Sequence, residues 1–498
     1  MPANESYLWT SLFAHFCLNG VGLWEGRALD LLIPLNGQDS RPLYEQIYQF
    51  IKDEIRCGNL KPQKKLPSSR ELAKNLKVSR STTQLAYEQL VSEGYLEAVP
   101  RKGYFTADIE GVFAPLSEHG SYDMKENETK EAHGEWKVDF SPRGIDLKNF
   151  PYSTWRKISR AVLKEDEKEL FLKGNTQGDL ELREAIRDYL HSARGVNCSA
   201  DQIVVGAGNE YLLMLLSQLL GRDLGIAMEN PTYEQAYRVL AGMGHQIYPV
   251  GMDESGLMVS ELRRLPVHVA YVMPSHQFPM GIVMPVKRRQ ELLSWAQECP
   301  DRYVIEDDYD SEFRYKGKPI PALQGMDADG RVIYMGTFSR AIAPAIRVGY
   351  LVLPKELLGK YLEQARFYSS TVSRVDQKIL TYFINGGYFE RHLNRMREIY
   401  KGKHDCLLSA LKPLEDQFEI EGEFAGLHVL LTSKRGMLEE ELFRAAAHAG
   451  VRVYGLSGFF IHEEHAEKKN TVVLGYARLD EEQIREGAGL LLKAFSMI

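Results

Sequence analysis

Five residues of the chain carry groups that bind phosphate in proteins. Thr337, Ser339 and Arg347 provide two hydroxyls and a guanidinium within one short stretch of sequence. Gly208 and Asn209 stand at the start of a predicted helix, where free backbone N–H groups and the helix dipole favour an anion. An arginine adds strong, charge-assisted hydrogen bonds to such a site. Together these residues predict a phosphate-binding site.

A carboxylate and two aromatic side chains extend this candidate site. Asp307 follows the apolar run 303–305, a predicted strand, and open α/β sheets bind ligands at the carboxyl ends of their strands. Tyr309 places a phenol two residues further on, and Tyr233 provides a second ring. Each residue alone has a plainer explanation: Asp307 could cap a helix, Tyr233 could pack in a core, and Arg347 could form a surface ion pair. Only their occurrence as an ordered set favours a ligand pocket.

A second set of polar residues lies nearer the N-terminus and suits nucleic acid. Arg80 and three hydroxyl residues begin a predicted helix, from which they could reach base edges or phosphates in a major groove. The alternative is that Thr82 and Thr83 only extend the helix cap while Arg80 is solvated. Three further cations could contact the DNA backbone or the minor groove. The predicted DNA-binding residues are Arg70, Arg80, Ser81, Thr82, Thr83, Arg101 and Lys102.

The elements around this second set form a known DNA-binding pattern. Apolar residues at helical spacing predict a helix over 42–56 and a short second helix, capped by Ser68 or Ser69, with Leu72, Ala73 and Leu76 on its apolar face; Ser79 is the predicted cap of a third helix. The predicted buried face of the third helix comprises Leu85, Ala86, Leu90 and Val91. Two apolar runs after it predict a hairpin with Arg101 and Lys102 at its tip. Three helices and a basic hairpin are typical of a winged helix-turn-helix.

The remainder of the chain alternates short apolar strands with helices. Predicted strands cover 202–205, 224–228, 267–273, 303–305, 332–335 and 348–353. Predicted helices between them cover 211–220, 234–243 and 286–297. This alternation implies a mainly parallel sheet with helices on its faces. The segment from residue 427 to the C-terminus is predicted to be a smaller α+β domain.

Length and charge indicate several domains with different partners. The 498 residues suffice for about two to four compact units. Residues 41–105 hold 12 Lys and Arg against 7 Asp and Glu, although the whole chain has a net charge of −7. A basic module on an acidic body suggests that one end of the chain meets a polyanion. The predicted divisions are an N-terminal extension (1–40), a winged helix-turn-helix (41–106), an acidic linker (107–137) and a large α/β body (138–498).

Cysteine and hydropathy patterns indicate the compartment. The five cysteines lie far apart, with neither metal-type spacing nor a disulfide framework. No apolar stretch approaches the length of a membrane span, and the N-terminus lacks the cationic start of a secretory signal. We therefore expect a reduced, cytoplasmic protein without a metal site and without membrane contact.

The motifs of both parts resemble known families. The head, with PLYEQIYQFIKDEIRCGNL, LPSSRELAKNLKVSRSTTQLAYEQLVSEGYL and RKGYF, closely resembles the DNA-binding head of the GntR superfamily. The body resembles the fold type I aminotransferases through NTQGDLELREAIRDYL, NPTY, PSHQFPMG, EDDYDSEFRY and GTFSRAIAPAIRVGYLVLP. Their combination is similar to the MocR family of regulators, in which an aminotransferase-like domain senses ligands.

This resemblance implies a cofactor, partners and roles for the pocket residues. In fold type I enzymes the cofactor is pyridoxal 5′-phosphate: Asp307 would pair with its pyridine nitrogen, Tyr309 would bond its ring hydroxyl, and Tyr233 would lie over its ring. The implied cofactor-binding residues are Gly208, Asn209, Tyr233, His276, Asp307, Tyr309, Thr337, Ser339, Arg340 and Arg347. The family also implies operator DNA, a small-molecule effector and a head-to-tail homodimer as partners.

One position departs from the family. Arg340 stands where the family has the lysine that forms a Schiff base with pyridoxal phosphate. A guanidinium stays protonated and is no amine nucleophile, and Lys355 lies beyond a predicted strand, so covalent attachment is not expected. Either the pocket binds the cofactor or a cofactor–amino-acid adduct non-covalently, or it has lost the cofactor, or arginine was deliberately introduced for lysine.

A second departure concerns the effector. The GABA-responsive members grip a carboxylate with two arginines, and those positions hold Gln235 and Gly458 here. The leading hypothesis is therefore a DNA-binding transcriptional regulator without enzymatic activity, whose aminotransferase-like domain senses a small molecule, namely a pyridoxal phosphate or amino-acid type ligand bound non-covalently. The alternatives are a pyridoxal-phosphate-dependent aminotransferase, which Arg340 disfavours, and a DNA-binding scaffold with a dead pocket.

Overall fold

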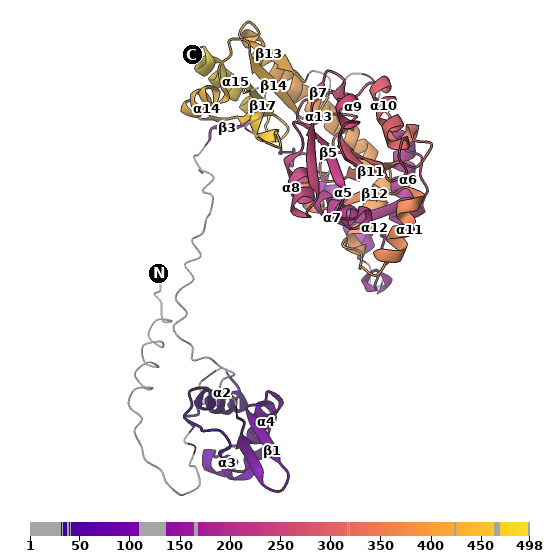
Figure 1. Cartoon of the computed structure of the whole chain (residues 1–498). Coiled ribbons are helices and arrows are strands. Elements are labelled where there is room, and N and C mark those ends of the chain that lie inside the picture. Colours follow the sequence, from indigo (N-terminus) through magenta and orange to yellow (C-terminus); the bar gives the residue numbers. More distant parts are fainter. Residues whose placement is uncertain are drawn as a thin grey trace. The chain divides into compact units, whose positions relative to one another are not determined.

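The computed structural model describes residues 31, 33–36, 39, 41–108, 136–163, 168–315, 317, 319–422, 425–462 and 469–496. The predicted extension before residue 31, and residues 109–135 of the predicted acidic linker, lie outside the described residues. The chain divides into two compact units, Met1–Glu131 and Ala132–Ile498 (Figure 1). We call them the head and the body and describe each by itself.

The head is a winged helix-turn-helix, as predicted. Its elements are α2 (Leu43–Arg56), α3 (Ser69–Leu76), α4 (Arg80–Ser92), β1 (Leu96–Val99) and β2 (Gly103–Thr106). The Ser68 hydroxyl caps α3 by accepting from the Glu71 amide at 3.2 Å, and the Ser79 hydroxyl caps α4 by accepting from the Thr82 amide at 3.1 Å. The two strands form an antiparallel hairpin.

The buried face of α4 differs from the prediction by a rotation about the helix axis. The residues that α4 buries are Thr83, Ala86, Tyr87 and Leu90. Leu85, predicted to be buried, is 48% exposed, so that prediction is wrong. A face at positions i, i+3, i+4 and i+7 from Thr83 excludes Leu85 and includes Tyr87, whose hydroxyl donates to the Pro67 carbonyl at 2.9 Å.

The body contains a seven-stranded sheet. In pairing order its strands are β4 (Ile203–Gly206), β12 (Gly349–Val352), β11 (Val332–Thr337), β10 (Tyr303–Asp308), β9 (Val269–Val272), β5 (Gly225–Glu229) and β6 (Gln246–Val250). β12 is antiparallel to both of its neighbours, and the other pairs are parallel. This confirms the mainly parallel sheet. The sequence pattern does not predict β6, and the predicted strand 303–305 is shorter than β10, which continues to Asp308.

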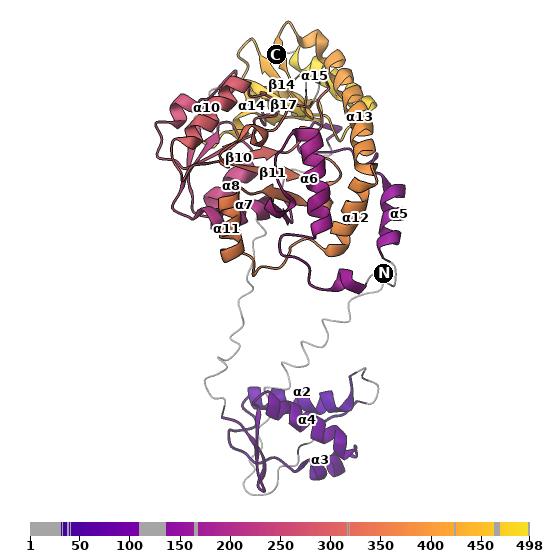
Figure 2. The ribbon, with the colours of Figure 1, turned by 90° about the vertical axis from the view of Figure 1, so that its right-hand side faces the viewer.

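Helices cover both faces of the sheet. They are α5 (Tyr152–Val162), α6 (Leu180–Arg194), α7 (Asn209–Leu220), α8 (Glu234–Gly242), α9 (Val259–Leu262), α10 (Val286–Gln297), α11 (Lys355–Gln364), α12 (Arg374–Asn385) and α13 (Tyr388–Leu411). α6 and α12 pack side by side (Figure 2). Tyr334 belongs to the core beneath these helices, whereas Met335 belongs to the core beneath α7, since side chains of a strand alternate between faces.

A smaller α+β domain completes the body, as expected from the sequence. Its antiparallel sheet has the order β13 (Phe418–Glu421), β14 (His428–Ser433), β17 (Thr471–Gly475) and β16 (Tyr454–Gly455), with α14 (Glu439–His448) and α15 (Glu481–Phe495). A short strand from the start of the body, β3 (Val138–Asp139), pairs in parallel with β15 (Val451–Arg452). Among the described residues, no helix has both the length and the apolarity to cross a membrane.

The buried hydroxyl of Thr83 generates a stability prediction. Its Oγ1 donates to the Ser69 carbonyl at 2.7 Å and thereby ties α4 to α3. Thr83→Val keeps the shape but leaves that carbonyl without its donor, so we expect the head to lose roughly 1–3 kcal/mol of stability. The loss is measured as the decrease in the free energy of unfolding of the head, from urea titrations in which unfolding is monitored by amide hydrogen exchange. Leu85→Ala, at an exposed site on the same helix, is the control, and an equal effect of both variants would contradict the prediction.

Candidate DNA-binding surface and ligand pocket

Most of the predicted DNA-binding residues lie on the surface of the head. Arg80 and Ser81 are exposed in the first turn of α4, and Thr82 is partly buried there. Arg70 is exposed near the start of α3. Arg101 and Lys102 are exposed at the tip of the hairpin, where Arg101 adopts a left-handed backbone with φ 65°.

Thr83 is a correction to the predicted surface. Its side chain is fully buried, and its hydroxyl is used within the head, as described above. A residue that closes the α3–α4 contact has no free group to offer DNA. The sequence could not separate it from Thr82, because both are short hydroxyl residues next to a helix cap.

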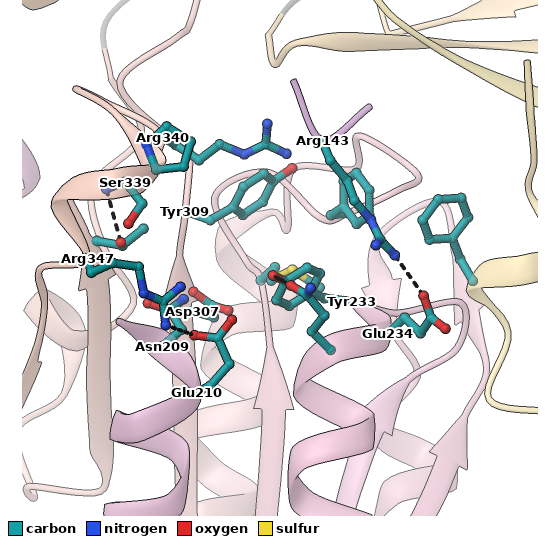
Figure 3. A pocket seen from close by; sticks show the side chains of 16 residues that line it. Arg143, Asn209, Glu210, Tyr233, Glu234, Asp307, Tyr309, Ser339, Arg340 and Arg347 are labelled. Atoms are coloured by element: carbon teal, nitrogen blue, oxygen red, sulfur yellow. Dashed lines mark hydrogen bonds and ion pairs between the residues drawn. The ribbon is translucent and has the colours of Figure 1, made fainter. Parts of the chain in front are cut away.

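The body contains a cavity of about 260 Å³ at the carboxyl end of its parallel strands. This volume is slightly below the ~300–1,000 Å³ found for small-molecule sites. Sixteen residues line it (Figure 3): Arg143, Asn209, Glu210, Tyr233, Glu234, Gln235, Met273, Phe278, Asp307, Tyr309, Thr337, Ser339, Arg340, Pro344, Arg347 and Phe459. Eight of the ten predicted cofactor residues are among them; Gly208 and His276 are not.

Asp307 lies in the floor of the cavity near the end of β10. It is 2% exposed, and one carboxylate oxygen, Oδ2, accepts a hydrogen bond from the buried Tyr271 hydroxyl. The other oxygen, Oδ1, is buried without a hydrogen-bond partner among the described residues. Burial raises the pKa of Asp307 to about 7. A protonated ring nitrogen would supply both the missing donor and the compensating charge.

Tyr309 separates the cavity from the predicted residue His276. The Nδ1 atom of His276 lies 3.0 Å from the Tyr309 hydroxyl and 3.0 Å from Asp310 Oδ1. The two rings stack with centroids 6.1 Å apart. His276 therefore lies behind Tyr309, where it positions the phenol, and the prediction that it lines the binding site is corrected.

Three of the predicted phosphate-binding residues, Asn209, Ser339 and Arg347, lie at one end of the cavity (Figure 3), and Thr337 also lines it. Asn209 begins α7, and Gly208 before it has φ 91°, which favours glycine. A Cβ atom at Gly208 would lie 2.8 Å from Arg347 Nη2, so a larger residue there would displace this guanidinium from its present position. Thr337 Oγ1 accepts from the Ser339 amide at 3.1 Å.

Arg347 is already paired within the protein. Its Nη2 donates to Glu210 Oε2 at 2.9 Å and to the Ala207 carbonyl at 3.2 Å. The ion pair is about half exposed, so it contributes little stability and an incoming phosphate can compete with it. Glu210 was not predicted as part of the site, although a carboxylate in the first turn after Asn209 was a usable signal.

Arg340 extends above Tyr309 toward the segment that carries Arg143 (Figure 3). Its Nη1 donates to the Gly144 carbonyl at 3.2 Å, and its Nη2 donates to the Pro142 carbonyl at 2.9 Å. Among the residues that the structure describes, no carboxylate forms an ion pair with Arg340. Its hydrogen-bonding groups are thus partly satisfied while its charge is not neutralised.

Arg143 and Glu234 form an ion pair on the opposite side of the cavity. Arg143 Nη2 lies 2.8 Å from Glu234 Oε2, and Glu234 also pairs with Arg238 at 2.5 Å. Neighbouring Gln235 accepts a hydrogen bond from the Tyr233 hydroxyl, and burial raises the pKa of Tyr233 to about 12. Arg143 was not predicted from the sequence, because nothing local relates it to Glu234, which lies 91 positions later.

Comparison with known proteins agrees with this geometry. Residues 43–106 match the family of bacterial regulatory proteins called gntR, and residues 147–491 match the aminotransferase class I and II family. The HTH-type transcriptional regulator YdeL of Bacillus subtilis (strain 168) is 38% identical over 475 residues, which cover 94% of this chain and 100% of that protein. The probable rhizopine catabolism regulatory protein MocR of Rhizobium meliloti is 32% identical over 468 residues, which cover 91% of this chain and 94% of that protein.

A solved structure supports the fold of the body. Kynurenine aminotransferase of Pyrococcus horikoshii superposes with a TM-score of 0.65 and 26% identity, covering 78% of this chain and 98% of that one. The fold and the pocket thus define a winged helix-turn-helix joined to a fold type I aminotransferase body. The chain belongs to the MocR-type regulators of the GntR superfamily and is a DNA-binding transcription regulator. This confirms the family and the fold class predicted from the sequence.

The exposed cations of the head generate a prediction for DNA binding. Arg80→Ala should weaken binding to the preferred DNA site by roughly 1–3 kcal/mol and relax base preference, because Arg80 begins α4. Lys102→Ala should mainly reduce the salt dependence of binding. Fluorescence anisotropy on a site that the parent protein selects from random DNA measures both. Arg435→Ala, an exposed arginine of the body, is the control, and unchanged base preference in the Arg80 variant would refute the assignment.

The unpaired oxygen of Asp307 generates a pH-dependent prediction. Because the folded-state pKa of about 7 exceeds the ordinary 3.8, stability falls as pH rises from about 4 to about 7. Asp307→Asn removes this penalty, so the thermal midpoint of the ligand-free variant relative to the parent should rise between pH 5 and pH 8. Circular dichroism measures the midpoints. Asp253→Asn should show no such rise, since the Arg288 guanidinium holds the pKa of Asp253 below its ordinary value. A constant difference for Asp307→Asn would contradict the prediction.

Proposed function

We propose that the body of this regulator is a sensor that binds pyridoxal 5′-phosphate, or a pyridoxal phosphate–amino-acid adduct, reversibly and without a covalent bond. The observation that carries the proposal is the buried, unpartnered Oδ1 atom of Asp307 in the cavity floor. A buried carboxylate oxygen without a hydrogen-bond partner destabilises the folded protein. A cationic ring nitrogen would donate to this oxygen and compensate its charge.

The other cavity residues fit the same group. Arg347, Thr337, Ser339 and the start of α7 would hold the phosphate, with Gly208 keeping the space open. Tyr309 would hydrogen-bond the ring hydroxyl, and Tyr233 would pack against the ring. When bound, pyridoxal phosphate supplies an electrophilic aldehyde on an electron-withdrawing ring.

Arg340 is the reason to propose a sensor and not an enzyme. Transaminases of this fold need an amine at this position, and a guanidinium provides neither a nucleophile nor a proton carrier at neutral pH. Arg340 instead donates two hydrogen bonds to the backbone carbonyls of Pro142 and Gly144. The relatives YdeL and MocR are named as regulators, which favours a sensor. The structural similarity to an aminotransferase supports the alternative, an enzyme.

The wider proposal includes the assembly. A head-to-tail homodimer in the cytoplasm would present two heads to two half-sites of an operator, which a single winged helix could not hold as tightly. Ligand in the body would change the affinity of the dimer for that operator.

Cofactor titration of the parent protein and Arg340→Lys tests the proposal. The parent should bind pyridoxal phosphate with a change in absorbance, lose it on dialysis, and gain no mass after borohydride treatment. Arg340→Lys should restore a covalent bond, so borohydride should fix one cofactor per chain, measured by intact mass. Adding Asp307→Ala should weaken both signals, because the partner of the ring nitrogen is gone.

Two results would overturn the proposal. The absence of binding in both the parent and Arg340→Lys would favour the scaffold with a dead pocket. Steady transamination by the parent at enzyme-like rates would favour the aminotransferase.

A further inference from the structure

The segment 141–144 is fixed on two sides where it passes the cavity. On one side it lies against β17, where a Cβ atom at Gly475 would come within 2.3 Å of the Ser141 carbonyl oxygen. The Gly475 amide also donates to the Phe140 carbonyl at 2.9 Å. On the other side, Arg340 holds the Pro142 and Gly144 carbonyls. Arg143 stands between these two carbonyls and is therefore carried by a restrained backbone.

The side chain of Arg143 is less restrained than its backbone. It lines the cavity and is 58% exposed, with Glu234 as its ion-pair partner. An exposed pair of this kind contributes little net free energy, so a ligand anion can replace Glu234. After such an exchange Glu234 would retain Arg238, its neighbour one helical turn away. The exchange would leave no carboxylate unpaired.

The surroundings of Arg143 suit an amino-acid carboxylate attached to a ring in the cavity. The positions that hold arginines in the GABA-responsive type carry Gln235 and Gly458 here, so neither offers a cation. Apolar side chains of Met273, Phe278 and Phe459 line the cavity and can receive an aliphatic side chain.

We propose that Arg143 binds the carboxylate of an amino-acid-type effector, and that Arg340 is a positioning residue that holds the Arg143 backbone over the cavity. The residue in the lysine position thus serves ligand selection. This inference rests on the proposed function, since it requires a phosphopyridine ligand in the cavity. The effector class is an apolar amino acid joined to pyridoxal phosphate.

Two ligands that differ by an amino-acid group test the role of Arg143. Pyridoxamine 5′-phosphate lacks the carboxylate, and N-(5′-phosphopyridoxyl)-L-leucine carries it; neither has an aldehyde, so neither can bond covalently to any lysine. Calorimetry on the full chain should give the leucine adduct at least roughly tenfold tighter binding. Arg143→Gln should remove this preference and leave the pyridoxamine phosphate affinity within about twofold. Arg435→Gln, which removes an exposed arginine outside the cavity, should keep the preference.

Arg340→Lys tests the positioning role. An ammonium group cannot hold two separate carbonyls as a guanidinium does, so the preference for the adduct should fall several-fold while pyridoxamine phosphate still binds. In the double variant Arg143→Gln/Arg340→Lys, the preference should fall no further than in Arg143→Gln alone, because Arg340 acts through Arg143. Multiplying losses would overturn the positioning role.

The failures of the two proposals are distinguishable. If the parent binds both ligands equally well, or if Arg143→Gln keeps the preference, the assignment of Arg143 is wrong while the cofactor-type pocket stands. If the parent binds neither ligand, the proposed function fails, and this inference fails with it.

Discussion

Three consecutive buried carboxylates at the end of β10 constrain the arrangement of the body around its cavity. Glu306 accepts hydrogen bonds from two backbone amides of a neighbouring loop, both at 2.8 Å. Asp308 accepts from Arg194 of α6 at 2.8 Å, in an ion pair whose side chains are 2% and 4% exposed. Because a buried carboxylate without partners is costly, these contacts fix the loop and α6 against the strand. Asp307 faces the opposite side of the sheet, where its Oδ1 atom remains without a hydrogen-bond partner from the described residues in the floor of the cavity.

Arg340 changes the chemistry available in the pocket, whereas the other residues expected to bind the cofactor still line the cavity, apart from Gly208 and His276. Arg340 occupies the position of the family's lysine, yet its guanidinium reaches across the cavity to backbone carbonyls of the segment that enters from the small domain. A planar group with several donors can join two separate carbonyls, which a single ammonium does poorly. The contact between the large and small domains at this point is therefore made by hydrogen bonds of a residue that also lines the cavity.

Sequence patterns predicted the order of helices and strands, the winged head and most of the cavity floor, because apolar periodicity and strand-end polar residues are local signals. They missed β6, whose sequence QIYPV is largely accessible and contains a proline, so its apolar signal is weak. They also misplaced Leu85 and Thr83. The mixed apolar and polar residues of α4 do not determine which face of this short helix is buried. Arg143 could not be predicted for another reason: only the completed fold brings it to its partner Glu234, and brings Arg340 to the backbone carbonyls on either side of it.

The pairing of β3 with β15 determines where the chain from the head enters the body. β3 belongs to a small ladder formed with the C-terminal domain, and residues 141–144 follow it directly on the way to the cavity. A strand held by a ladder cannot slide by itself without breaking its backbone hydrogen bonds. The start of the body is therefore held by the C-terminal domain, and a rotation of that domain would carry β3 with it.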